Sequence, residues 1–417
     1  MSIERVFRPV DYVKISIFGA ALSVLWISLH TIIIPLRLLE FAPEAQKNTY
    51  LGLLTFAGSM VAVFIQPLAG ALSDRFSSSL GRRRPFILVG TLLALLFLPG
   101  IGLSGSFPFL LLGYCLLQVA TNIAQGPFQA FIPDMVPQER RGIASGAKSL
   151  AEVLGGVAFL RLVAYFMDNY AGDGGEIWLW MAIGFPGLIL LGGMIATMLT
   201  VKEQPSSLSG QPSTGKTLAG AYKIDTKGHR SFVWFLLSRL FILMAMVVLQ
   251  TFALYFVRDV IHHSNPAGVT ADLMITVGVF LLLAVYPAGQ LSDRLGRKPI
   301  ILFSGFIGIL GIAVLFFMRT YAGVLVCGGL LGISSGAFLS TNWALATDLV
   351  PAGEEARYLG LTNIATAGAG ALARLTGPVI DFFNAQQSGL GYSVMLLICV
   401  FYFILGSALV IPVKGKR

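Results

Sequence analysis

Long apolar runs alternate with short polar connections along almost the whole chain, and this pattern predicts helices that cross a membrane. Such a helix needs about 20 predominantly apolar residues to cross about 30 Å of hydrocarbon. Eight long runs contain no Asp, Glu, Lys or Arg, and one of them is long enough for two helices. The eight runs cover 15–36, 48–73, 85–133, 177–201, 273–292, 299–318, 320–347 and 382–413.

Three further helices with internal charges are expected over 143–167, 231–257 and 358–380, which brings the predicted total to twelve. The one long hydrophilic segment, 202–230, follows the sixth helix and is rich in Ser, Gly, Pro and Lys. We therefore interpret it as a cytoplasmic linker. The predicted fold is an all-α membrane protein in which twelve transmembrane helices form two pseudo-symmetric six-helix bundles, over 1–201 and 231–417.

Composition indicates a membrane protein rather than a soluble one. The chain is 56% hydrophobic and only 12% charged, whereas soluble domains carry about 25% charged residues. The three cysteines, Cys115, Cys327 and Cys399, lie within apolar runs and fit neither a disulfide framework nor a zinc site. The chain has only four histidines and no recognisable nucleophile–base set or phosphate-binding loop, so we expect neither an enzyme nor a metal site.

The net charge of +9 is distributed unevenly between the two sides of the membrane. Most Lys and Arg residues fall on the side that also carries both predicted termini, and by the positive-inside rule this side faces the cytoplasm. We expect an integral protein of the cytoplasmic (inner or plasma) membrane, without a cleavable signal because the first apolar run is too long for one. The expected partners are the lipid bilayer and a small-molecule substrate, not nucleic acid, and the chain is expected to be a monomer.

A charged stretch between two apolar runs occurs once in each half of the chain. Its copies are Gln66–Ile87 (QPLAGALSDRFSSSLGRRRPFI) and Gly289–Ile300 (GQLSDRLGRKPI). A second repeat relates Ala130–Pro137 (AFIPDMVP) to Ala344–Pro351 (ALATDLVP). Two parallel six-helix repeats are typical of one large class of secondary transporters.

The chain as a whole resembles the major facilitator superfamily of transporters. A narrower resemblance links Val63–Ile87 to the segment between the second and third helices of plant sucrose/proton symporters and their animal relatives, a glycoside-pentoside-hexuronide-like group. Gln118–Asp134 (QVATNIAQGPFQAFIPD) resembles the fourth-helix motif of the same group, and His30 occupies a place similar to that of its early histidine. This resemblance implies the major facilitator fold and transport of a sugar by alternating access.

The fourth helix departs from the pattern of the sucrose symporters. That group carries there an acid that is taken to bind the proton and an Arg further along, whereas this chain has Gln118 and Gln129. A new acid, Glu152, stands one helix later, where the group has an Asn. Either the proton site has moved to Glu152 or proton coupling is lost, and a saccharide or glycoside remains the leading substrate class.

The charged stretches are expected to form ionic networks at the cytoplasmic side, because carboxylates near helix ends can pair with guanidinium groups. We hypothesise a latch that holds this side closed and breaks when the halves rock. The alternative is that these charges only set the topology. In the first half the candidates are Asp74, Arg75, Gly81, Arg82, Arg83, Arg84, Asp134, Glu139 and Arg140. In the second half they are Asp293, Arg294, Gly296, Arg297, Lys298, Asp348, Glu354 and Arg357.

Four amides share one face of the predicted fourth helix, because Gln118, Asn122, Gln125 and Gln129 are spaced by 4, 3 and 4 residues. Amides both donate and accept hydrogen bonds, which suits neutral ligands rich in hydroxyl groups. Hydrogen bonding between helices is the alternative role for some of them. The stripe of four favours a wet cavity.

Charged residues inside helices supply the other cavity candidates. Lys148 and Glu152 lie one turn apart in the fifth helix. Burial disfavours a charged carboxylate and the nearby ammonium favours it, so Glu152 is a candidate to exchange a proton; a static ion pair is the alternative. Arg239 is a candidate to bind a substrate anion. Arg374, near the outer end of its helix, could instead pair with loop acids or lie on an outer gate. Either side chain could simply reach toward the interface, Arg374 least easily. Further candidates are Trp26, His30, Asn342, Trp343 and Asn363.

These features predict a secondary active transporter that moves a sugar, a glycoside or a similar polar solute by alternating access. We expect coupling to protons, with a proton or other cation gradient as the energy source and no cofactor. An exporter of drugs or other metabolites is the alternative transporter and would have apolar cavity walls. A transport-dead sensor is a third interpretation, although the 29-residue linker and short tails leave little room for a signalling appendage.

Overall fold

The structure is a computed structural model that describes residues 8–171, 175–203, 230–350 and 355–413. Every regular element in these ranges is a helix, as predicted, and eleven helical segments are long and apolar enough to cross a membrane. The helix expected over 358–380 is formed by α17 (Glu355–Arg374) and α18 (Gly377–Asn384), and it is not among those eleven. The expected linker lies mostly outside the described residues, and Glu354 lies there too.

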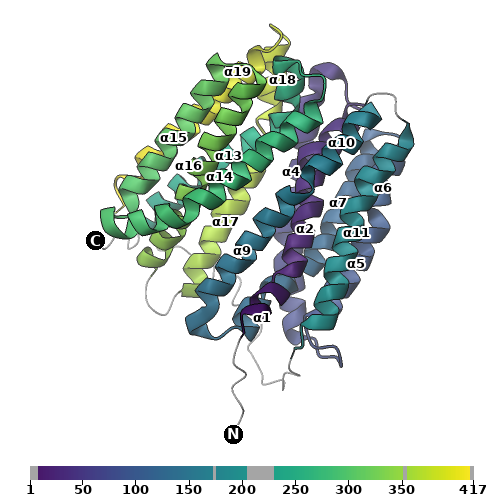
Figure 1. Ribbon diagram of the computed structural model, residues 1–417, viewed down its shortest axis with the longest axis vertical. Coiled ribbons are helices and arrows are strands. Elements are labelled where there is room, and N and C mark those ends of the chain that lie inside the picture. The colour runs from purple at the N-terminus through teal and green to yellow at the C-terminus, as the bar shows by residue number, and fades with distance from the viewer. Residues whose placement is uncertain (1–7, 172–174, 204–229, 351–354, 414–417) are drawn as a thin grey trace. The chain divides into compact units, whose positions relative to one another are not determined.

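The first half of the chain contains six long helical segments, some of them broken into shorter helices (Figure 1). Their parts are α1 (Pro9–Lys14), α2 (Ile17–Ser28), η1 (Leu29–Ile33), α3 (Ile34–Leu38), η2 (Glu44–Gln46), α4 (Lys47–Arg75), α5 (Arg84–Phe97), α6 (Pro99–Leu103), α7 (Phe107–Gln129), α8 (Phe131–Met135), η3 (Gln138–Arg140), α9 (Arg141–Ala158), α10 (Leu160–Ala171) and α11 (Glu176–Thr200).

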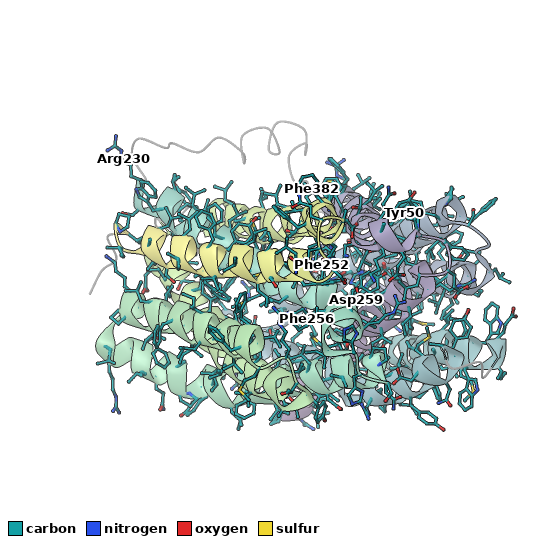
Figure 2. All side chains as sticks on the ribbon, turned by 90° about the horizontal axis from the view of Figure 1, so that it is seen from above. Tyr50, Arg230, Phe252, Phe256, Asp259 and Phe382 are labelled. Carbon is teal, nitrogen blue, oxygen red and sulfur yellow. The ribbon has the colours of Figure 1, made fainter. Side chains whose placement is uncertain are left out.

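The second half has longer uninterrupted helices. They are α13 (Arg230–Phe256), η4 (Val257–Ile261), α14 (Pro266–Leu295), α15 (Arg297–Phe317), α16 (Tyr321–Leu349), α17, α18 and α19 (Leu390–Val410). Figure 2 shows Arg230 and Asp259 far apart, near the two ends of the segment that α13 and η4 form.

The helices pack into two compact units. The N-terminal unit contains α1–α3, the part of α4 from Ala57 onward, and α5–α11. The C-terminal unit contains α13–α19 together with η2 and the start of α4 up to Phe56. Helix α4 therefore contributes its first turns to one unit and the rest of its length to the other.

The packing inside the two units follows one pattern. In the N-terminal unit α2 packs against α9 and α11, and α5 packs against α7 and α11. In the C-terminal unit α13 packs against α17 and α19, and α15 packs against α16 and α19. The first, third, fourth, fifth and sixth helices of each bundle thus have equivalent neighbours, which is the pseudo-symmetry that the sequence repeats predict.

Glycines allow equivalent helices to approach closely in both units. A Cβ atom at Gly126 of α7 would overlap the Gln66 carbonyl oxygen of α4. In the C-terminal unit, Cβ atoms at Gly332 and Gly336 of α16 would press on carbonyl oxygens of α14. Small residues commonly form such contacts between membrane helices, because van der Waals packing rather than exclusion of water holds these helices together.

Candidate functional site

Arg83 is the centre of an ionic network at one end of the N-terminal unit. Gly81 has a φ of 101°, a value that glycine adopts readily, and the chain turns there before α5 begins. The Arg83 side chain reaches Asp74 at 2.5 Å and Asp134 at 2.9 Å, and it also donates to the Ser73 hydroxyl at 2.5 Å. Arg82 adds a second ion pair with Asp134 at 2.7 Å. The network joins the ends of α4, α5 and α8.

Arg297 repeats this arrangement in the C-terminal unit. Gly296 has a φ of 92° and precedes α15, and the Arg297 guanidinium binds Asp293, the Ser292 hydroxyl at 2.8 Å and Asp348 at 3.2 Å. Sequence repetition therefore corresponds to a repeated set of contacts. Each network lies within one unit, so its role as a latch between the halves stays a prediction.

The remaining charges of these stretches have different surroundings. Arg84 donates to the Met198 carbonyl oxygen and Lys298 donates to the Ile411 carbonyl oxygen at 3.0 Å. Four further candidates are exposed, and the side chain of Arg357 is outside the described part of the chain. The four are Arg75, Glu139, Arg140 and Arg294.

Glu203 is a member of the first network that sequence reasoning missed. Its carboxylate accepts hydrogen bonds from the backbone N–H groups of Arg82, Arg83 and Arg84, the shortest at 2.8 Å. A negative charge at the N-terminus of a helix satisfies otherwise unpaired N–H groups and complements the helix dipole. No local pattern links these positions, because they are about 120 residues apart in the chain.

A hydrogen-bond network crosses the interior of the N-terminal unit. The Tyr114 hydroxyl lies 2.8 Å from His30 Nε2 and accepts a hydrogen bond from Gln118 Nε2 at 2.9 Å. Asn122 in turn donates to the Gln118 side chain at 3.1 Å. The network joins η1 to α7 and brings together three residues that the sequence singled out. Tyr114 was missed, although it lies four residues before Gln118 and extends the same stripe.

The lower half of the amide stripe has a different environment. Gln125 is half-buried and Gln129 is exposed, and neither makes a hydrogen bond to another described residue. Only the first two amides therefore bond to one another, and this bond lies within α7 rather than between helices. The other two remain available to a ligand.

Aromatic rings lie beside this network. The Trp26 and His30 rings stack with centroids 4.8 Å apart, and the Tyr114 ring meets both edge-on. His30 belongs to the π-helical turn η1, a geometry that is frequent at functional sites. Gly58 makes room for the Tyr114 ring, since a Cβ atom there would overlap it.

Lys148 and Glu152 form the ion pair that their spacing predicts, at 3.5 Å. The Lys148 ammonium also lies 5.0 Å from the centre of the Phe128 ring. The Glu152 carboxylate sits against α2 at Gly19, where a Cβ atom would come within 2.7 Å of it. Its side chain is 34% exposed, so Glu152 is less deeply buried than its place in an apolar helix predicts.

Arg239 lies where α13, α16 and α17 meet in the C-terminal unit. Its guanidinium donates to Asn342 Oδ1 through one terminal nitrogen and to the Thr366 hydroxyl through Nε at 3.0 Å. Trp343 and Asn363, the other candidates on α16 and α17, are exposed and are not among the partners of Arg239. Arg374 donates to the Gly370 carbonyl oxygen of its own helix at 3.0 Å.

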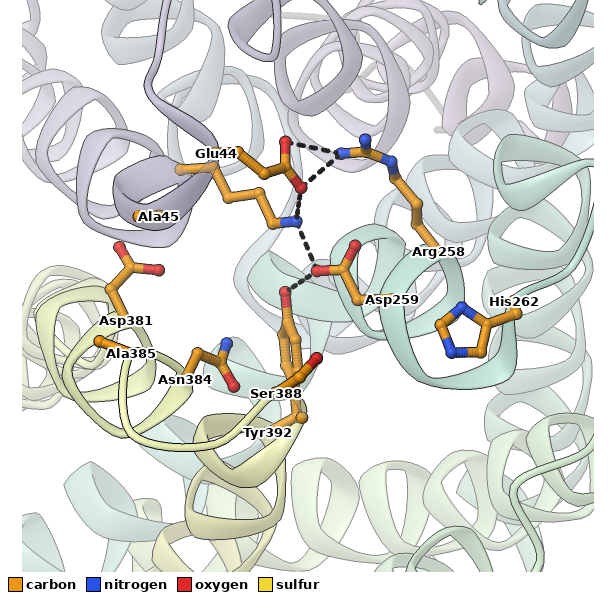
Figure 3. A pocket seen from close by; sticks show the side chains of 12 residues that line it. Glu44, Ala45, Arg258, Asp259, His262, Asp381, Asn384, Ala385, Ser388 and Tyr392 are labelled. Carbon is orange, nitrogen blue, oxygen red and sulfur yellow. Dashed lines mark hydrogen bonds and ion pairs between the residues drawn. The ribbon is translucent and has the colours of Figure 1, made fainter.

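A pocket of about 610 Å³ with several charged side chains lies beside η4 in the C-terminal unit (Figure 3). Because η4 precedes α14 and Arg297 follows it, the pocket and the Arg297 network lie near opposite ends of that helix. Lys47 of α4 pairs there with Asp259 at 2.6 Å and with Glu44 at 2.5 Å, and the Tyr392 hydroxyl donates to Asp259 at 2.5 Å. Arg258 pairs with Glu44 at 3.4 Å. The Lys47–Asp259 and Glu44–Arg258 pairs join residues more than 200 positions apart, so no local sequence pattern indicates them.

Asp381 of α18 caps the start of α4. Its carboxylate accepts hydrogen bonds from the Thr49 backbone N–H at 2.6 Å, the Thr49 hydroxyl at 2.7 Å and Asn48 Nδ2 at 2.8 Å. Asp381 and Asn48 are buried. Near this site a Cβ atom at Gly377 would overlap the Asn48 carbonyl oxygen, so the backbones of α18 and α4 are in direct contact. These contacts explain why the first turns of α4 belong to the C-terminal unit.

Most of the chain matches the model of one known protein family. A family model described as MFS/sugar transport protein matches residues 46–413. The chain belongs to this family. The protein is therefore an integral membrane protein of the major facilitator superfamily, a family of transporters and not of enzymes, as predicted.

Curated relatives include sucrose transport proteins of plants. The chain is 30% identical to sucrose transport protein SUC4 of Arabidopsis thaliana over 33% of its own length and 30% of the relative. It is 22% identical to sucrose transport protein SUT5 of Oryza sativa over 84% of this chain and 79% of that protein. A third relative, solute carrier family 45 member 4 of Mus musculus, is 35% identical over 26% of this chain and 16% of its own. The first relatives are thus matched over about a third of their length or less.

Solved structures confirm the predicted major facilitator fold. The D-xylose-proton symporter matches with a TM-score of 0.70 and 16% identity, over 97% of this chain and 98% of that chain. The nucleoside transporter NupG also matches with a TM-score of 0.70 and 16% identity, over 97% of this chain and 99% of that chain.

Proposed function

We propose that the protein is a secondary active transporter that moves a sugar, a glycoside or a similar hydroxyl-rich solute by alternating access, with protons as the coupling ion. The observation that carries the proposal is the His30–Tyr114–Gln118–Asn122 network beside the Trp26 ring. It lies inside one bundle of a chain that belongs to a sugar transport family.

The network has the chemistry that sugar recognition needs. Amide, imidazole and hydroxyl groups both donate and accept hydrogen bonds, which matches the hydroxyl groups of a saccharide. Aromatic side chains supply a flat apolar surface for the C–H face of a sugar ring, while a few placed polar groups fix its orientation. Gln125 and Gln129 extend the set with amides that bond to no other described residue.

The names of similar proteins favour the same substrate class. The curated relatives include sucrose transport proteins, and the solved structures of the same fold include transporters of D-xylose and of nucleosides. All of these solutes are rich in hydroxyl groups.

Glu152 is the proposed proton carrier. The fourth-helix position where the sucrose symporters carry an acid is Gln118, and its amide bonds to Tyr114 and Asn122. Protonation of Glu152 would remove its attraction to Lys148, 3.5 Å away, and would free the ammonium to move. The Glu152 carboxyl also lies against α2 at Gly19, so a change in its charge would act on the helix that carries Trp26 and continues into η1 with His30.

Alternating access would break the charged contacts at one end of the molecule and then at the other. We propose that the outward side opens when Lys47 leaves Asp259 and the start of α4 leaves Asp381. The Arg83 and Arg297 networks would act at the cytoplasmic side. The proposed setting is the cytoplasmic membrane, with both termini in the cytoplasm and a monomeric chain.

Uptake into proteoliposomes tests this function. Purified protein should take up a labelled saccharide, and Tyr114→Phe should lower the apparent affinity about tenfold, because two neighbours lose the shared hydroxyl. Tyr165→Phe is the control, since Tyr165 is 55% exposed on α10. Failure to take up any saccharide, together with export of apolar compounds, would instead support the drug exporter.

A further inference from the structure

Contacts with α16 and α17 fix the position of the Arg239 side chain in the C-terminal bundle. On the antiparallel helices α13 and α16, Arg239 meets Asn342 and, two turns along, Met246 meets the Ser335 hydroxyl at 3.7 Å. On the parallel helix α17, the Thr366 hydroxyl accepts from Arg239 at 3.0 Å. Helix packing thus holds the guanidinium at one point inside the bundle.

The charge of Arg239 has only neutral partners in the described part of the chain. The residue is 6% exposed, and its hydrogen bonds go to an amide oxygen and a hydroxyl oxygen. A guanidinium has five N–H groups, so most of them have no acceptor among the described residues. Buried charges are normally paired, because removing an ion from water is costly.

A second donor beside the guanidinium is also unsatisfied. Asn342 is fully buried at 0% exposure, and its Nδ2 group has no hydrogen-bond partner among the residues that the structure describes. Buried polar groups without partners are rare in native proteins and call for an explanation. The pair therefore has an excess of donors and one uncompensated positive charge.

Thr366, which accepts a hydrogen bond from Arg239, lies on an exposed face of α17. Thr366 and Asn363 are both exposed and lie three residues apart on α17, so they share one face of that helix. Thr366 also donates its own proton to the Thr362 carbonyl oxygen at 3.0 Å, which leaves its oxygen directed at Arg239. A ligand that approaches along this face would meet the guanidinium next to a hydroxyl and an amide.

We infer that the transported solute carries an anionic oxygen group, a carboxylate or a phosphate, which Arg239 and Asn342 bind in the C-terminal bundle. The inference rests on the proposed transport of a hydroxyl-rich solute and narrows it to acidic sugars and their relatives. Carboxylate and phosphate both accept paired N–H donors from a guanidinium, in geometry that a neutral hydroxyl cannot match. The competing role for Arg239 is a purely structural tie between α13, α16 and α17.

Binding of three matched probes to the purified full-length protein separates these roles. The probes are D-glucose, D-glucuronate and D-glucose 6-phosphate, which differ at one carbon, and the readout is isothermal titration. Wild type should bind one of the two anions at least about tenfold more tightly than glucose, and the better anion identifies the group. Arg239→Gln should remove that preference, so that the better anion binds no more tightly than glucose. Arg319→Gln, an exposed site in the same unit, should keep it.

The possible results separate anion binding by Arg239 from a purely structural role. Equal binding of glucose and both anions to wild type would overturn the inference and leave the proposed sugar transport intact. An anion preference that survives in Arg239→Gln would also overturn it. Loss of glucose binding in Arg239→Gln, together with a lowered melting temperature, would establish the structural role. Binding of none of the three probes would count against the proposed substrate class and the inference together.

Discussion

Arg83 and Arg297 occupy equivalent places in the two bundles of this transporter. Each guanidinium binds a serine and an aspartate near the end of the second helix of its bundle and an aspartate at the end of the fourth. Each follows a glycine with positive φ, at Gly81 and Gly296. The repeated charged motif therefore forms the same set of contacts in each of the two bundles.

Replacing either arginine should destabilise its own bundle. Arg83→Gln leaves two carboxylates without their buried partner, and we expect a loss of about 1–3 kcal/mol in unfolding free energy. Arg297→Gln should cost less, since its side chain is 23% exposed against 5% for Arg83. Thermal unfolding in detergent measures both.

Arg294→Gln is the control for these variants, because Arg294 is exposed and is not a member of the Arg297 network. Its melting temperature should stay close to wild type. An equal loss in all three variants would mean that general surface charge, and not the network, sets the stability.

Close approach of α4 and α7 at Gly126 gives a second prediction. Alanine normally stabilises a helix by about 0.5–1 kcal/mol relative to glycine. Gly126→Ala should nevertheless destabilise the fold by about 1–3 kcal/mol, because the new methyl group meets the Gln66 carbonyl oxygen. The comparison is Gly192→Ala on α11, where no atom lies within 4 Å of the added Cβ. A stabilised Gly126→Ala protein would show that the two helices are further apart than described.

The cap that Asp381 provides to α4 gives a third prediction. Asp381→Ala leaves the half-buried Thr49 N–H and hydroxyl without this acceptor, and leaves the buried Asn48 amide with only its bond to the Tyr392 hydroxyl at 3.4 Å. Unfolding free energy should fall by about 2–4 kcal/mol, from the combined cost of the donors that lose this acceptor. Gln386→Ala, at an exposed position shortly after α18, should leave the melting temperature unchanged. If Asp381→Ala melts like wild type, water must replace the carboxylate and the cap carries no stability.

The repeats and the amphipathic stripes made much of the architecture predictable. The aspartates Asp134 and Asp348 were expected as partners of the basic loops, and both pairs form. Asp134 lies in α8, just after the fourth helix of its repeat, and Asp348 lies in the last turn of α16. The pairing of Lys148 with Glu152 followed from their spacing along one helix. Sequence repeats and helical periodicity therefore predict contacts of these two kinds.

Contacts between distant segments were not predictable in the same way. Glu203 caps a helix that begins about 120 residues earlier, and Lys47 meets Asp259 more than 200 residues along the chain. The spacing of the amides also does not predict that Gln118 is buried while Gln129, on the same face of α7, is exposed. Burial depends on which neighbours cover each turn, and these neighbours come from the whole bundle.

The coupling role of Glu152 is the most consequential claim, and sugar accumulation under an imposed pH gradient tests it most directly. Proteoliposomes with an acidic exterior should concentrate a labelled saccharide above its external level when they contain wild-type protein. Glu152→Gln should abolish this accumulation and retain exchange of saccharide across the membrane, because the proton-binding carboxylate is gone while the Tyr114 network is intact. Glu176→Gln, an exposed acid at the start of α11, should accumulate like wild type. Accumulation by Glu152→Gln equal to wild type, or uptake indifferent to the gradient, would contradict the proposal.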